Sequence, residues 1–178
     1  MSDFSESALH PAHRSQRIPG HDYASGGFYF ITICTHEKKP ILGKIENATV
    51  ELSKYGSLAR ECWVQIPHHS PRVNLHSFVL MPNHIHGIVQ IGHKDAIPLL
   101  APVLPHVDKG SLGAVIRSFK AIVTKRARAD LHFEGEFWQR NYYEHLLRNE
   151  REFLKRFAMH SGQSEDVGFG SRESREEK

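Results

Sequence analysis

Apolar residues recur along the chain with the periods of a mixed helix-and-strand protein. Residues 28–35 are rich in aromatic and β-branched side chains and predict a buried strand. Residues 40–52 contain two short apolar runs around a polar pair and predict a hairpin. Two further strands are predicted at 75–81 and 84–91, with a Pro-Asn turn between them.

Apolar positions three and four residues apart predict three helices. The first begins after Ser53 and runs to about residue 65. Pro67 is expected to stop it there. The second begins after Ser111, and the third follows a sequence like a capping box that starts at Asn149. The residues expected to be buried by the last two helices are Leu112, Val115, Ile116, Phe119, Ile122 and Val123, followed by Phe153, Leu154 and Phe157.

The order of these elements predicts an α+β protein. We expect a two-layer sandwich, with an antiparallel sheet and helices packed on one face. A chain of 178 residues suits a single domain with loose ends, and residues 27–160 are expected to form it. Polar residues 1–26 predict a flexible arm, and the Gly-, Ser- and charge-rich residues 161–178 predict a disordered tail. Three prolines and two glycines within residues 92–110 predict a loop.

The composition is that of a globular protein without a membrane span or a secretory signal. Hydrophobic residues make up 39% of the chain, which is ordinary for a globular protein. No apolar run reaches 18 residues and the first 20 residues contain no apolar stretch, so neither a membrane span nor a secretory signal is expected. Cys34 and Cys62 lie in apolar segments without a Cys-x-x-Cys pair, and we expect two reduced core thiols in a cytoplasmic protein.

Basic residues cluster more than the net charge of +3 suggests. Residues 117–128 contain basic side chains and no acidic one, and a second basic group lies within residues 140–156. Such basic stripes are typical of surfaces that bind the phosphate backbone of nucleic acids. A solvated helix face can carry the same pattern. The candidate DNA-binding residues are Arg117, Lys120, Lys125, Arg126 and Arg140.

A second chemical signal is the sequence His84-Ile85-His86. Side chains two apart on a strand share a face, so both imidazoles should project opposite to Ile85 and Val89. Two neutral imidazoles can share a divalent cation, whose remaining ligands would be an acid, an amide or water. The alternative is a polar strand face whose histidines are hydrogen-bonded to neighbours.

Four stretches of the chain, in order, resemble the HUH single-tyrosine (IS200-like) transposases. Residues 78–89, FVLMPNHIHGIV, resemble the region of the HUH motif. Residues 30–35 resemble the first strand of that family, residues 110–120 its middle helix, and residues 137–145 the stretch before its last helix. The resemblance covers residues 26–158, and the REP-associated tyrosine transposases are the branch that it matches most closely.

This resemblance implies a ferredoxin-like fold and metal-dependent chemistry on DNA. In the family, Mg²⁺ or Mn²⁺ on the two histidines polarises the scissile phosphate of single-stranded or hairpin DNA. A tyrosine then attacks, forming a 5′-phosphotyrosine link and leaving a 3′-OH. The Lewis acid compensates for the weak nucleophilicity of a phenol whose pKa is about 10. REP-like repeats as targets, transposition of a mobile element and a homodimer are further implications.

At the nucleophile the chain departs from the family. The family's tyrosine lies in the last helix, about one turn past the part that corresponds to residues 148–152, and a Gln or Asn four residues later helps to bind the metal. Here Met159 occupies the expected position, and Gln163 falls four residues beyond it. Tyr142 and Tyr143 are the candidate substitutes, with aromatic packing as the alternative explanation.

The sequence therefore leaves three candidate functions. The first is an HUH transposase or nicking enzyme, and the second is a catalytically impaired DNA-binding relic of that family. The third is a zinc hydrolase that uses His84 and His86, for which no His-Glu-x-x-His or Cys-x-x-Cys pattern is present.

Overall fold

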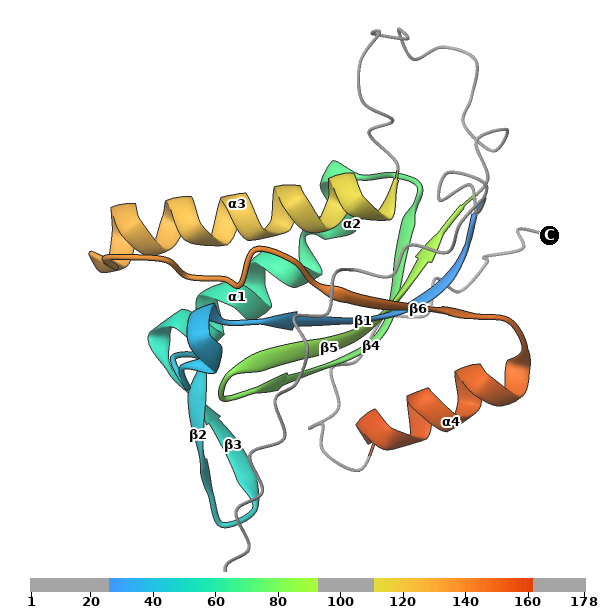
Figure 1. The fold of residues 1–178 in the computed structure, drawn as a ribbon, viewed down its shortest axis with the longest axis horizontal. Coiled ribbons are helices and arrows are strands. Elements are labelled where there is room, and N and C mark those ends of the chain that lie inside the picture. Colours follow the sequence, from blue (N-terminus) through green and yellow to red (C-terminus); the bar gives the residue numbers. More distant parts are fainter. Residues whose placement is uncertain (1–25, 93–110, 162–178) are drawn as a thin grey trace, which may run out of the picture.

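A computed structural model describes residues 26–92 and 111–161 (Figure 1). The expected loop at 92–110, the arm at 1–26 and the tail at 161–178 lie outside these residues, apart from their boundary positions.

A four-stranded antiparallel sheet in the order β4-β5-β1-β6 forms the centre of the fold. Its strands are β1 (Gly27–Cys34), β4 (Val73–Met81), β5 (His84–Ile91) and β6 (Tyr143–Leu147). The first three agree with the sequence prediction. The fourth strand, β6, was not predicted from the sequence, because it mixes exposed polar and apolar side chains and has no clear apolar alternation.

The predicted hairpin is formed by β2 (Gly43–Glu46) and β3 (Thr49–Leu52). Its turn consists of Asn47 and Ala48, both with positive φ, as tight hairpin turns require. A short 3-10 turn, η1 (His36–Lys38), links β1 to this part of the chain.

The helices are α1 (Lys54–Val64), α2 (Ile66–His69), α3 (Leu112–Leu131) and α4 (Glu150–Ser161). The predicted caps are confirmed, since Ser53, Ser111 and Asn149 each accept a hydrogen bond from the backbone N–H three residues later. Pro67 was expected to end the first helix, and α1 does end at Val64. Pro67 itself lies in the first turn of α2, which was not predicted, where the missing N–H of proline has no helical acceptor to lose.

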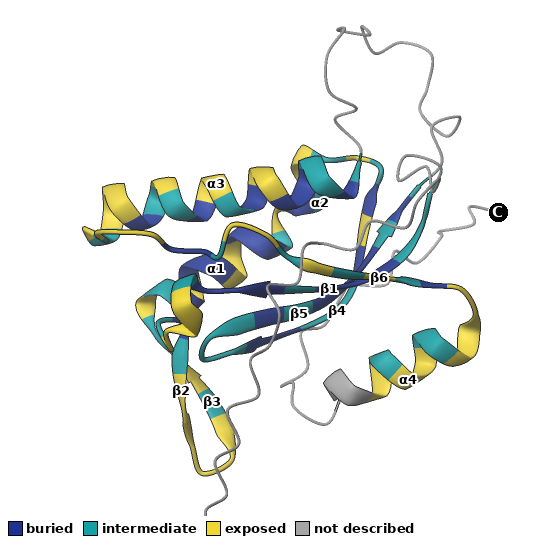
Figure 2. Ribbon diagram, viewed as in Figure 1, coloured by how far each residue is buried: buried dark blue, intermediate teal, exposed yellow. Residues whose placement is uncertain are grey.

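The main core lies between the sheet and the pair α1 and α3, whose inward sides are buried in Figure 2. Tyr29, Ile31 and Ile33 of β1 point into this core and are fully buried. The apolar stripe predicted for α3 is buried except for Ile122, which is 40% exposed, while Ala127 is buried further along the helix.

Helix α4 lies on the opposite face of the sheet (Figure 1). Phe153 packs against Phe28 there, with ring centroids 5.4 Å apart. Leu154 and Phe157 were also expected to be buried but are 54% and 40% exposed. The α+β sandwich with an antiparallel sheet is confirmed, and α1 and α3 share one face as predicted. The last helix differs because it packs through Phe153 against a second, smaller apolar cluster on the other face of the sheet, formed by Phe30, Ile88 and Leu147.

Two expectations from composition can be compared with the structure. Among the described residues, no helix is long and apolar enough to cross a membrane. Cys34 and Cys62 are buried free thiols, as expected, and burial raises the pKa of both.

Candidate functional site

The predicted geometry of the histidine pair is confirmed. His84 and His86 project from the polar face of β5, while Ile85 and Val89 are buried in the main core on the other side. The Nε2 atoms of the two imidazoles are 3.0 Å apart. Two ligands at about 2.1 Å from one ion, at right angles, are about 3 Å apart. The spacing of this pair therefore fits two neighbouring positions around an ion such as Mg²⁺ or Mn²⁺.

Neighbouring side chains orient both rings. Nδ1 of His84 lies 2.7 Å from Asn83 Oδ1, a carbonyl oxygen that accepts the Nδ1–H and leaves Nε2 with its lone pair. Nδ1 of His86 lies 2.8 Å from the hydroxyl of Thr32, which can act as donor or acceptor. When the hydroxyl accepts, both Nε2 atoms carry lone pairs, as a shared metal requires.

The electrostatic environment favours the neutral form of His84. Burial, and after it the positive charge of Lys38, lowers the pKa of this histidine. Because only the neutral imidazole binds a metal, this shift lets His84 act as a ligand at lower pH than an unperturbed histidine would.

The turn that carries Asn83 and His84 is tied to the end of β1 by Thr35. The N–H of Thr35 donates to the carbonyl of Asn83 over 3.0 Å. Its hydroxyl, which is buried, lies 2.9 Å from the same carbonyl and 2.7 Å from that of Lys39. These bonds give the histidine pair a fixed place at one end of the sheet.

A positive charge from α4 reaches the same face. The ring of Phe30 stacks on His86 with a centroid distance of 5.3 Å. The guanidinium of Arg156 lies 4.6 Å from the centre of that Phe30 ring. Arg156 and His86 therefore both contact the ring of Phe30 on this face of the sheet.

Within residues 26–92 and 111–161, no cluster of three or more His, Cys, Asp or Glu side chains could hold a metal. Water or substrate oxygens would have to complete a shell around the pair. The other predicted ligand, Gln163, lies outside the described residues. Met159 lies within α4, at the helical position where the resemblance places a tyrosine.

The sheet separates the two candidate tyrosines. Tyr143 is paired with Thr32, and Thr32 is paired with His86. Residues directly opposite one another in neighbouring strands share a face, so Tyr143 lies on the face of the histidines. Tyr142 packs against the main core on the other face. The sequence could not distinguish these two neighbours because β6 was not predicted.

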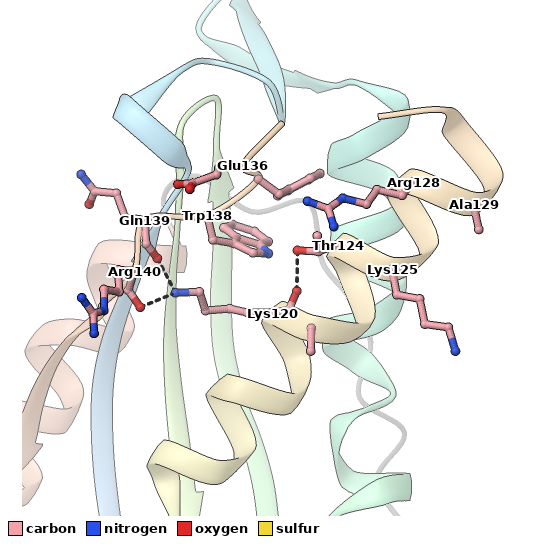
Figure 3. Close-up of a pocket in the computed structure, with 11 residues that line it drawn as sticks. Lys120, Thr124, Lys125, Arg128, Ala129, Glu136, Trp138, Gln139 and Arg140 are labelled. Atoms are coloured by element: carbon pink, nitrogen blue, oxygen red, sulfur yellow. Dashed lines mark hydrogen bonds between the residues drawn. The ribbon is translucent and has the colours of Figure 1, made fainter. Parts of the chain in front are cut away.

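A basic groove runs between α3 and residues 136–142 (Figure 3). It consists of two adjoining hollows that share Lys120 and Arg140. Four of the predicted DNA-binding residues line the groove: Arg117, Lys120, Lys125 and Arg140. Arg128, which was not among the predicted residues, lines it as well.

Two of the predicted DNA-binding residues have structural partners. Lys120 donates to the backbone carbonyls of Gln139 and Arg140, as Figure 3 shows, and burial lowers its pKa. Arg126 binds both carboxylate oxygens of Glu61, at 2.8 and 3.3 Å. Lys120 therefore holds one wall of the groove in place, and Arg126 links α3 to α1.

Comparisons with known proteins bear on the family and the fold of the chain. No family profile matches the chain. It is 40% identical over 149 residues to an uncharacterised protein of Haemophilus influenzae, a match that covers 80% of this chain and 82% of that protein. Its fold is similar to that of a REP-associated tyrosine transposase solved with a bound REP hairpin, with a TM-score of 0.51 and 16% identity. That similarity covers 76% of this chain and 65% of the transposase chain, which is less than two thirds of its length.

Proposed function

The chain belongs to the same family as the Haemophilus protein, and we propose that it is a transposase-type enzyme that cleaves and rejoins DNA with the help of a divalent ion. The spacing of the His84 and His86 Nε2 atoms carries this proposal. The fold shared with a REP-associated tyrosine transposase supports it, as the sequence resemblance implied.

Each part of the site has a distinct role in this proposal. A divalent ion held by His84 and His86 would supply a Lewis acid that polarises a phosphodiester. Asn83 and Thr32 keep the two imidazoles in the orientation that binds the ion. Arg156 adds positive charge where negative charge accumulates during the reaction.

We propose single-stranded or hairpin DNA, including REP-like repeats, as the substrate. The basic groove supports this choice, since arginine and lysine side chains bind phosphates regardless of base sequence. The similar transposase was solved with a REP hairpin. A homodimer stays a prediction from the resemblance, and sedimentation of the purified protein tests it.

Met159 favours a second candidate function, that of a catalytically impaired DNA-binding protein. Its thioether cannot attack phosphorus or carry a phosphodiester, and it occupies the helical position where the resemblance places the nucleophile. In this alternative, metal and DNA binding persist without cleavage.

A combined binding and cleavage experiment distinguishes these functions. Mn²⁺ binding is measured by titration calorimetry on the wild type and on His84→Ala, His86→Ala and His68→Ala, where His68 is a control from α2. We expect the first two variants to lose the site and the third to keep it. Hairpin oligonucleotides with single-stranded flanks are then incubated with and without Mn²⁺. Cleavage that requires the ion supports the enzyme, binding without cleavage supports the impaired protein, and loss of both metal and DNA binding contradicts both.

A further inference from the structure

We propose that Tyr143 is the nucleophile of this site. This inference rests on the proposed function and extends it by naming the residue that forms the covalent link to DNA. It starts from the pairing of Tyr143 with Thr32 and of Thr32 with His86, which places these side chains in one row across three strands.

Among the described tyrosines, Tyr143 is the one that lies on the histidine face. Tyr29 is fully buried in the main core. Tyr55 packs against that core from α1, and Tyr142 packs against it from the start of the β6 segment. Tyr23 lies outside the described residues. Tyr143 is 44% exposed, so a substrate can reach it.

The separation between Tyr143 and the histidine pair suits a substrate that lies between them. Neighbouring strands are about 4.8 Å apart, so the backbones of Tyr143 and His86 are about 10 Å apart across β1. The residue between them in the row, Thr32, is small. A phosphodiester lying over Thr32 is within reach of a long phenol from one side and of the imidazoles from the other.

The basic groove leads to the same place. β6 is an edge strand, with Tyr142 on its groove side and Tyr143 on its histidine side. A DNA strand that leaves the groove beside Arg117 and Arg140 can pass over this edge and arrive directly at Tyr143. The position of Tyr143 therefore connects the basic groove to the histidine pair, although the two lie on opposite faces of the sheet.

The chemical step balances without an external reagent. The phenol oxygen of Tyr143 attacks phosphorus, so a bond forms between Oη and phosphorus and the bond from phosphorus to the 3′ oxygen breaks. The electron pair goes to the 3′ oxygen, which takes up the proton released by the phenol through water. The products are a 5′-phosphotyrosine and a free 3′-OH, and attack by a 3′-OH on the same link rejoins DNA.

The first test locates the covalent link. Hairpin oligonucleotides with randomised single-stranded flanks and a 3′ label are incubated with Mn²⁺ and the full-length protein, and labelled protein is digested for mass spectrometry. We expect a nucleotide adduct on Tyr143 that is lost in Tyr143→Phe and kept in Tyr55→Phe, a control on α1 away from the site. An adduct on another residue overturns the role of Tyr143 and leaves the proposed function intact. Cleavage without any adduct also overturns it.

The second test measures proximity and does not depend on activity. Tyrosine ring signals labelled with ¹³C are recorded by NMR as Mn²⁺ is added, with Tyr143→Phe and Tyr142→Phe used for assignment. A paramagnetic ion at His84 and His86 should broaden the Tyr143 signal before that of Tyr142, and the selective broadening should vanish in His86→Ala. Equal broadening of both rings, or none at Tyr143, contradicts the proposal. Absence of Mn²⁺ binding in the wild type would instead contradict the proposed function.

Discussion

At the scale of single residues, the hydroxyl of Thr32 is the side-chain partner of Nδ1 of His86. It lies on the neighbouring strand, directly opposite His86, and contacts Nδ1 at 2.8 Å. A metal ligand needs its proton on Nδ1 and its lone pair on Nε2, and a hydroxyl that accepts the Nδ1–H stabilises that tautomer. Asn83 performs the same role for His84, with a carbonyl oxygen that can only accept.

Removing the hydroxyl of Thr32 should weaken metal binding. Thr32→Val keeps the shape of the side chain but offers no acceptor to His86, so we expect Mn²⁺ affinity to fall about tenfold or more. Thr32→Ser keeps the hydroxyl and should bind Mn²⁺ nearly as the wild type does. Calorimetric titration of both variants measures the effect, and equal affinities for Val and Ser would rule out this role of the hydroxyl.

At the scale of elements, β5 must satisfy two requirements at once. Its polar face presents the histidines, and its other face packs against α1 in the main core. Between His84 and Ile88 the core side includes Gly87, and a Cβ built there would lie 2.6 Å from the ring of the fully buried Trp63. A glycine at this position is therefore required by the close approach of an indole ring from α1.

Gly87→Ala should destabilise the protein. The new methyl group would force Trp63 or the strand to move, and such overpacking costs about 1–3 kcal/mol. Gly92→Ala is a matched control just after the same strand, because among the described residues its Cβ would meet one atom, at the ordinary distance of 3.4 Å. Urea unfolding of both variants measures the difference. A Gly87→Ala protein as stable as Gly92→Ala would show that the core accommodates the methyl group.

At the scale of the whole molecule, the basic groove and the histidine pair occupy opposite faces of one sheet. α3 and residues 136–142 form the groove on the core side of β6, while α4 lies on the histidine side (Figure 1). A DNA strand that contacts both the basic groove and the histidine pair must pass over the β6 edge of the sheet. The proposed DNA binding and the proposed chemistry should therefore be separable by substitution, because the residues of the groove do not contribute to the histidine pair.

Groove arginines should control the salt dependence of DNA binding. Arg117→Gln combined with Arg140→Gln should weaken binding to all hairpin DNAs alike. It should also reduce the slope of log K against log salt concentration by about 1.5, because two fewer phosphates are neutralised. Arg126→Gln is the control, since this arginine is paired with Glu61 and should change the slope little. Fluorescence anisotropy at several salt concentrations provides the slopes, and an unchanged slope in the double variant would show that the groove does not bind the DNA backbone.

The sequence by itself determined the elements whose signal is local. The period-2 pattern of residues 84–91 predicted the strand and the shared face of His84 and His86, and the side chains of Ser53 and Ser111 predicted two helix starts. These predictions hold because strand alternation and helix capping depend on residues a few positions apart.

Only the tertiary structure decided the features that depend on distant partners. β6 has no clear apolar period, and its place beside β1 separates Tyr142 from Tyr143. In the same way, Lys120 and Arg126 look like neighbouring surface cations in the sequence, and only packing directs the first to backbone carbonyls and the second to Glu61. The physical reason is common to all of them. Strand pairing and ion pairing between segments far apart in the chain are set by packing of the whole molecule, which local periodicity does not record.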